Sequence, residues 1–240
     1  MTQSKLGLNY LFQGFHLICQ PGMKRFVAIP LAINMSLFVG LFFVARHFIH
    51  VFNLWFVNHL PAWLHWLSGI LWVVFIFCFL LVMVYTFVMF ANLIAAPFNS
   101  FLAEEIEFYL TGNKIKSRSM YENIKDVPRI VGRQLAILGY YLPRALLILI
   151  LFIIPVVHIL AAVLWILFNA WFLAFTYLDY PTDNHQIPLQ AVKIWMQNKR
   201  LVTLGFGLTV LVANMIPILN LFAMPAAVAG ATKFWLEESQ

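Results

Sequence analysis

The chain consists of long uncharged runs separated by short polar segments. Leu67 to Ala103 holds 37 residues without Asp, Glu, Lys or Arg, and Phe26 to Ala45 holds 20. A helix needs about 20 apolar residues to cross a bilayer core, so each run predicts a transmembrane helix. The helix over Phe26 to Ala45 should bend near Pro30. The helix over Leu67 to Ala103 should kink or end at Pro97, because proline lacks an N–H donor. The aromatic, histidine-rich segment 46–66 is interpreted as the loop between them.

Two further uncharged runs lie in the C-terminal half, Ala145 to Leu178 with 34 residues and Leu201 to Thr232 with 32. Each contains an interior proline, Pro155 and Pro217. Two full spans with a turn need more than about 40 residues. The pieces around Pro217 are about 15 residues, or roughly 22 Å as helix, which is short of a core of about 30 Å. We therefore expect two hairpins that enter the bilayer and turn back. Two long, proline-kinked single spans are the alternative.

Residues 6–20 have the periodicity of an amphipathic helix that lies in the membrane interface and stops at Pro21-Gly22. The apolar positions and the polar positions of this helix fall on opposite faces. The predicted apolar face is Leu8, Leu11, Phe12, Phe15 and Ile18, and the polar face is Asn9, Gln13, His16 and Gln20.

The remaining polar segments also carry helix signals. A helix that starts before the acidic residues at 104, 105 and 107 should end at Gly112, a residue suited to a helix C-terminus. Ser119 and Glu122 have capping-box spacing and should open the next helix. Residues 179–185 are interpreted as a turn, and an amphipathic segment follows it and ends at Lys199-Arg200.

Composition agrees with a membrane protein. The chain is 63% hydrophobic and only 10% charged, with a mean hydropathy of +0.87, whereas soluble domains carry about 25% charged residues. We expect an all-α integral membrane protein with two long transmembrane helices, the two half-penetrating hairpins and amphipathic helices, in a single domain over 1–240. The net charge of +6 favours anionic lipid or an anionic solute over nucleic acid.

No enzyme motif is present. The sequence lacks a phosphate-binding loop, the two-histidine zinc motif, a serine-nucleophile elbow and paired CxxC motifs. We therefore expect no enzyme activity, no ATP hydrolysis by this chain, no cofactor and no metal.

Lys24-Arg25 is the first candidate site, because a divalent oxyanion needs charge-assisted donors and Arg offers a fork that matches tetrahedral oxygens. Gly7-Leu8-Asn9 stands at a helix start, where free N–H groups also favour anions. The alternative is that two basic residues beside a span only fix its topology.

A basic stripe is the second candidate. Lys125, Arg129 and Arg133 recur every four residues and share one helix face, so they could line an anion route with Glu104 and Glu107 as gating partners. The alternative is a face resting on anionic lipid.

Further ionisable residues lie beside the apolar runs. Arg144 borders one of these runs, where an ionisable group is a functional suspect or snorkels to the interface. Asp179, Asp183 and His185 could carry protons or a cation. Asp side chains bonded to a turn backbone are the alternative.

A set of motifs in order along nearly the whole chain resembles the CysZ family of bacterial sulfate permeases. These are Tyr10-x-x-x-Gly14, Pro21-Gly22-Met23-Lys24-Arg25-Phe26, Pro30-Leu31-Ala32-Ile33-Asn34, Ala91-Asn92-x-Ile94-Ala95-Ala96-Pro97-Phe98-Asn99, Leu102-Ala103-Glu104, Asp126-Val127-Pro128-Arg129-Ile130, Tyr141-Leu142-Pro143-Arg144-Ala145, Asp179-Tyr180-Pro181-x-Asp183-Asn184-His185 and Met215-Ile216-Pro217-x-Leu219-Asn220-Leu221.

The resemblance implies sulfate uptake across the bacterial inner membrane for assimilation into cysteine, without an ATPase subunit. It implies an anion site formed by the backbone around Gly7-Leu8-Asn9 and by the Lys24-Arg25 pair, where relatives often have two arginines. We expect a multi-pass, homo-oligomeric permease or channel for sulfate or related oxyanions. Proton coupling is one option for its mechanism. A membrane scaffold that binds anionic lipid or a partner is the alternative function.

Overall fold

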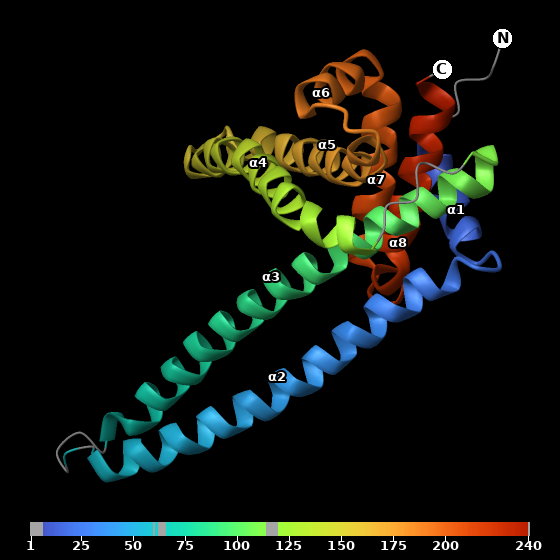
Figure 1. The fold of residues 1–240 in the computed structure, drawn as a ribbon. Helices are drawn as coiled ribbons and strands as arrows, with labels where there is room; N and C mark the ends of the chain where they lie inside the picture. The colour runs from blue at the N-terminus through green and yellow to red at the C-terminus, as the bar shows by residue number, and fades with distance from the viewer. Residues whose placement is uncertain (1–6, 60, 62–65, 114–119, 240) are drawn as a thin grey trace. The chain divides into compact units, whose positions relative to one another are not determined.

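The computed structural model describes residues 7–59, 61, 66–113 and 120–239, without the side chains of 34, 57, 68, 86, 88–96, 120–127, 130 and 131. These residues form helices and no strand (Figure 1). In chain order the helices are α1 (Leu8–Ile18), α2 (Lys24–His59), α3 (Ser68–Thr111), α4 (Met120–Ile153), α5 (His158–Asn184), α6 (Leu189–Asn198), α7 (Arg200–Met215) and α8 (Pro217–Glu238).

Within the part of the chain that the structure describes, four stretches are long and apolar enough to cross a membrane, namely Lys24–Phe56, Gly132–Ile153, His158–Asn184 and Pro217–Glu238. The described part of α3 adds a shorter apolar stretch, Gly69–Tyr85. The chain is therefore an all-α membrane protein, as the uncharged runs predict.

Contacts along the chain divide it into two compact units. The first comprises residues 1–27 and 96–240, and the second comprises 28–95. Each unit has its own internal contacts, and the single domain over 1–240 stays a prediction.

The second unit contains the main parts of α2 and α3. Helix α2 runs through Pro30 and continues to His59, so the prediction of a loop over 46–66 is wrong for 46–59. Residues 46–59 contain no Gly or Pro to stop the helix, and their aromatic side chains pack on α3: Phe52 stacks on Phe75.

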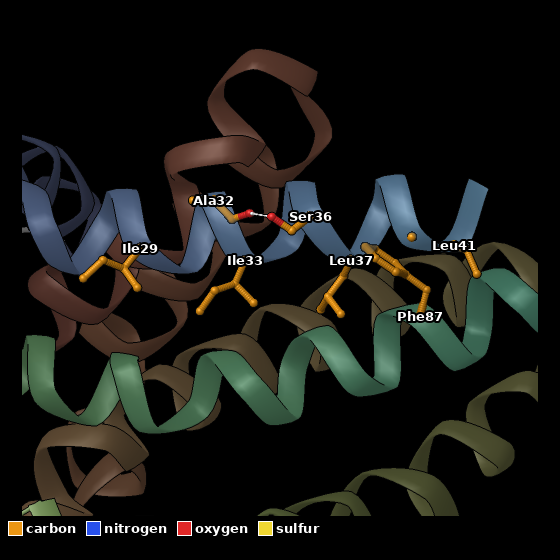
Figure 2. Close-up of a pocket in the computed structure, with 8 residues that line it drawn as sticks. Ile29, Ala32, Ile33, Ser36, Leu37, Leu41 and Phe87 are labelled. Carbon is orange, nitrogen blue, oxygen red and sulfur yellow. Dashed lines mark hydrogen bonds between the residues drawn. The ribbon is translucent and has the colours of Figure 1, made fainter. Parts of the chain in front are cut away.

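An apolar groove lies on the second unit (Figure 2). Among the described residues that line it, the one polar side chain is Ser36, whose hydroxyl donates a hydrogen bond to the carbonyl of Ala32 at 2.9 Å. The side chains that the structure describes in this groove therefore offer no free hydrogen-bond donor to an anion.

The core of the first unit is built on close helix crossings. Gly14 of α1 faces the backbone of α8 so closely that an added Cβ would overlap the carbonyl oxygen of Ala226, and α1 lies against α8 (Figure 1). Tyr10 stacks on Phe234 with ring centroids 4.8 Å apart. Gly207 of α7 meets the backbone of Ala170 in α5 in the same way. Small residues let these backbones approach.

Helix α1 is present as predicted, but its buried face is different. The buried side is Tyr10, Leu11, Gly14, Leu17 and Ile18, while Leu8 and Phe12 of the predicted apolar face are exposed, Phe12 at 66%. One side of α1 therefore packs on protein, and exposed apolar side chains remain for the membrane interface.

Both interior prolines mark reversals of the chain. Helix α4 ends at Ile153, Val156 has a φ of 73°, and α5 begins at His158. Helix α7 ends at Met215, and Pro217 is in the first turn of α8. The helical hairpins are confirmed and the two long kinked spans are wrong. The arms α4 and α5 have 34 and 27 residues, longer than expected, and the depth of the hairpins in the membrane stays a prediction.

The helix that carries the acidic residues continues through Pro97 and ends at Thr111. The prediction that Pro97 could end it is wrong. Gly112 has a φ of 71°, and its N–H donates to the carbonyl of Phe108 at 2.9 Å, which confirms the predicted C-terminus. Ser119 and the side chain of Glu122 lie outside the described residues, so the capping box is not tested.

The predicted turn over 179–185 is wrong. Helix α5 includes Pro181 and continues to Asn184, and its last turns are buried. The amphipathic segment that follows is confirmed as α6, which ends next to Lys199.

Candidate anion-binding site and polar network

The first cationic site is at the start of α2. Gly22 has a φ of 89°, a conformation that glycine adopts without strain, and α2 begins at Lys24. The side chains of Lys24 and Arg25 are exposed. The first N–H groups of a helix lack intrahelical acceptors and carry the positive end of its dipole. Backbone donors and two cationic side chains therefore meet at one point, a combination that suits an oxyanion.

Arg25 has a weak internal partner. Its guanidinium lies 3.6 Å from the carboxylate of Glu105 and is 61% exposed, and it lies over the ring of Phe26 at 4.8 Å. An exposed ion pair of this kind contributes little to stability, so a bound anion can replace Glu105 at modest cost.

The predicted sulfate residues do not all meet. Gly7 is the N-cap of α1 and is buried so closely against α7 that an added Cβ would overlap the carbonyl oxygen of Val202. Leu8 and Asn9 are exposed beside it. Lys24 and Arg25 follow the other end of α1, and an 11-residue helix is about 16 Å long. One small oxyanion cannot contact both ends.

The backbone donors left beside these side chains are therefore the N–H groups of Gly22, Lys24 and Arg25, since Met23 donates to the carbonyl of Gln20 at 3.2 Å and Phe26 donates to that of Met23 at 3.0 Å. Gly22 and the backbone role of Lys24 and Arg25 are missing from the sequence-based set. A Pro-Gly pair directly before two basic residues at a helix start is the signal that could have identified them.

A polar cluster holds the N-terminal part of α1 in place. The Tyr10 hydroxyl lies 3.2 Å from a carboxylate oxygen of Glu237 and 3.4 Å from one of Glu238, and Lys199 donates to Glu238 at 2.6 Å. Burial, followed by the charges of the two glutamates, raises the pKa of Tyr10 above its ordinary value. The hydroxyl therefore stays protonated and donates to these carboxylates.

The second cationic site is a buried network between α4 and the end of α5. The guanidinium of Arg133, 12% exposed, lies 2.8 Å from Asp179 and 3.4 Å from Asp183, and it donates to the carbonyl of Ile187 at 2.8 Å. Arg129 pairs with Asp183. Two of the three predicted basic residues are thus joined to two of the three predicted coupling residues.

These contacts change the expected partners of the basic stripe. The carboxylates that pair with Arg129 and Arg133 include Asp179 and Asp183 of α5. The carboxylate of Glu107 is 7% exposed and lies 2.9 Å from Nε2 of His185. Glu104 is half-buried. The side chain of Lys125 lies outside the described part of the chain.

Neutral polar pairs continue the network toward α3. Asn99 donates to the hydroxyl of Tyr180 at 3.2 Å, and Asn184 donates to the carbonyl of Ser100 at 2.9 Å. The sequence signal for these contacts is weak, because neutral residues in an apolar helix have no charge that suggests a partner.

Arg144 lies in a different cluster. Its guanidinium is exposed, donates to the carbonyl of Tyr140 at 2.8 Å and lies over the Tyr140 ring at 3.9 Å. Nζ of Lys193, from α6, lies 4.3 Å from the centroid of the same ring. Burial, followed by the charge of Arg144, lowers the pKa of Lys193. Two cations thus meet at one aromatic ring, and the sequence-based set contains only one of them.

Comparison with known proteins identifies the family. A family model described as "Sulfate transporter CysZ/Etoposide-induced protein 2.4" matches residues 10–225. The chain belongs to this family. The match includes α2, the polar network, the α4–α5 hairpin and α7, and it ends within α8.

Individual relatives agree over nearly their full lengths. The chain is 46% identical to "Sulfate transporter CysZ" of Pseudomonas fluorescens (strain Pf0-1), over 97% of this chain and 93% of that one. It is 46% identical to the protein of the same name from Pseudomonas syringae pv. tomato, with 97% and 92% covered. It is 42% identical to that of Salmonella typhimurium, with 98% and 94% covered.

Proposed function

We propose that this protein is a sulfate permease that works without an ATPase subunit. The observation that carries the proposal is the exposed Lys24-Arg25 pair at the N-terminus of α2, in a member of a family whose relatives are named sulfate transporters. The proposed setting is the inner membrane of a bacterium, with sulfate feeding cysteine synthesis. Related oxyanions share the same tetrahedral chemistry.

Anion capture is the first proposed step. Sulfate accepts hydrogen bonds from the backbone of the first turn of α2 and from Arg25, while Lys24 supplies a second positive charge. Arg25 exchanges the carboxylate of Glu105 for the anion. The capture site would not include Gly7, Leu8 and Asn9, because they lie at the far end of α1.

Passage along the basic residues is the second proposed step. Arg129 and Arg133 attract the anion, and Asp179 and Asp183 compete with it for the same guanidinium groups. Such competition keeps binding weak enough for release, a requirement of any conduction pathway. Arg144 with Lys193 is a further cationic position, and Glu104, Glu107, Lys125 and His185 are proposed as gating or coupling residues.

A homo-oligomer is the proposed assembly, because partly inserted hairpins leave one chain little material to enclose a pathway. Coupling to protons through Asp179, Asp183 or His185 is proposed as one driving force, and passive flow down a gradient as the other.

Sulfate binding by purified protein tests the capture site. Equilibrium dialysis with labelled sulfate should give a Kd that rises at least about tenfold in Lys24→Ala/Arg25→Ala, because charge-assisted hydrogen bonds contribute about 1.5–3 kcal/mol each. Gly7→Ala is not a suitable comparison, since its Cβ would disturb packing. Arg200→Ala, an exposed cation at the start of α7, is the matched control and should retain affinity. Selective loss of anionic-lipid binding, without sulfate binding by the unaltered protein, would favour the scaffold.

Removing the competing carboxylate should act in the opposite direction. Glu105→Gln is expected to lower the Kd for sulfate by at most about fivefold, since an exposed ion pair contributes about 0–1 kcal/mol. The same dialysis measures it. A Kd that rises in Glu105→Gln would show that Glu105 supports the site and does not compete with the anion.

A further inference from the structure

We propose that a groove around Arg46, lined by residues of α2 and α3, binds the phosphodiester headgroup of a membrane phospholipid. The groove is lined by the polar residues Arg46, His47, His50 and Asn53 of α2 and by Trp72 of α3, together with apolar side chains that include Leu80. All of these residues are described and belong to the second unit. None of them belongs to the sulfate route proposed above.

The charge of Arg46 has no counter-charge in its unit. Arg46 is the only Asp, Glu, Lys or Arg between residues 28 and 95, and the first acidic residue of the whole chain is Glu104. Its guanidinium is exposed and makes no ion pair within the described residues. An arginine at membrane depth normally pairs with another group or reaches the interface. Its counter-ion must therefore come from outside this unit.

The position of Arg46 along the chain indicates which anion is available. It directly follows the 20 uncharged residues from Phe26 to Ala45, a length of about 30 Å as a helix, which matches the hydrocarbon core of a bilayer. Counted from Phe26, this length places the guanidinium where the apolar core gives way to the phosphate layer, while α2 itself continues to His59. Lipid phosphate is the most concentrated anion at that depth.

The shape and chemistry of the groove favour a lipid over a free ion. The Trp72 indole N–H donates to the side-chain oxygen of Asn53 at 3.2 Å, which ties α3 to α2 and leaves the amide nitrogen of Asn53 as a donor. The histidines add polar ring nitrogens, and the apolar lining continues toward the span, where an acyl chain would lie. Trp72 lies in the second turn of α3, and a tryptophan near a helix end is typical of an interfacial anchor.

Native mass spectrometry of the full-length protein in detergent, titrated with phosphatidylglycerol, tests the site. The first lipid adduct should have an apparent Kd about fivefold weaker in Arg46→Gln, because one arginine near an anionic headgroup contributes about 1 kcal/mol. Arg46→Lys, which keeps the charge, should have an apparent Kd between that of the unaltered protein and that of Arg46→Gln. Arg200→Gln, which removes an exposed cation from the start of α7, should bind like the unaltered protein. Size-exclusion profiles establish that each variant is folded.

Two results would overturn the proposal. The first is an Arg46→Gln adduct no weaker than that of Arg200→Gln. The second is displacement of the first lipid by excess sulfate, accompanied by loss of sulfate binding in Arg46→Gln, which would make the groove a site for a soluble oxyanion. The proposal is supported if the lipid stays bound in excess sulfate, if lipid affinity falls in Arg46→Gln but not in Arg200→Gln, and if the fall is smaller in Arg46→Lys. Failure of this site leaves the sulfate proposal untouched, because the Lys24-Arg25 variants test that separately.

Discussion

Asp179→Ala is expected to destabilise the protein by about 3–5 kcal/mol, the usual cost of removing one partner from a buried ion pair. Asp179 is 2% exposed and lies 2.8 Å from the guanidinium of Arg133, which is 12% exposed. Without it, the carboxylate that the structure still places near Arg133 is the more distant Asp183 at 3.4 Å, and the carbonyl of Ile187 remains as a neutral acceptor at 2.8 Å. Thermal unfolding in detergent should show a clear fall in Tm.

A double variant separates stability from transport. Arg133→Met/Asp179→Leu removes both charges and should recover most of the lost stability, because a buried pair can often be replaced by apolar residues without cost. Arg129 and Asp183 keep each other as partners. If the proposed route is right, this folded variant still transports sulfate poorly. Normal flux in the double variant would make the pair purely structural.

Gly14→Ala should have the second large effect. The new Cβ would overlap the carbonyl oxygen of Ala226, which is backbone and cannot rotate away, so α1 must shift from α8. Overpacking of this kind costs about 1–3 kcal/mol, and the Tm of the purified protein should fall. The shift would also move the turn at Gly22, which follows α1, and sulfate binding should weaken.

Gly139→Ala is the matched control. Gly139 lies in α4, and apart from its chain neighbours and the adjacent backbone of its own helix, no described atom is within 4 Å of the position its Cβ would take. Since alanine favours a helix over glycine by about 0.8–1 kcal/mol, its Tm should stay the same or rise. Equal losses in Gly14→Ala and Gly139→Ala would show that the α1–α8 contact is not responsible.

Local signals predicted the helix ends that depend on a single residue. Gly112 ends α3 through a positive φ, and Pro217 opens α8, because the chemistry of each residue is local. The same reasoning failed where a proline or a polar segment was taken as enough to interrupt a helix. Pro181 lies inside α5, where neighbouring helices bury the last turns, and α2 passes 46–59 because polar or aromatic residues alone do not stop a helix.

The candidate site was predictable in composition more than in arrangement. Lys24, Arg25, Arg133 and Asp179 were all identifiable as ionisable residues in an apolar chain. Their pairing was not, because Arg133 and Asp179 are 46 residues apart and only the packing of α4 on α5 brings them together. The separation of Gly7 from Lys24 likewise depends on the length and direction of α1, and Lys193 joins Arg144 only through the placement of α6.

The most direct test of sulfate permeation is the flux of radiolabelled sulfate into liposomes that contain only this protein, with and without a pH gradient. The account predicts protein-dependent uptake that Lys24→Ala/Arg25→Ala loses and that Lys24→Arg, which keeps both charges, retains. A response to the gradient would support proton coupling, and its absence would support passive flow. No uptake above that of empty liposomes, by protein shown to be folded, would contradict the permease.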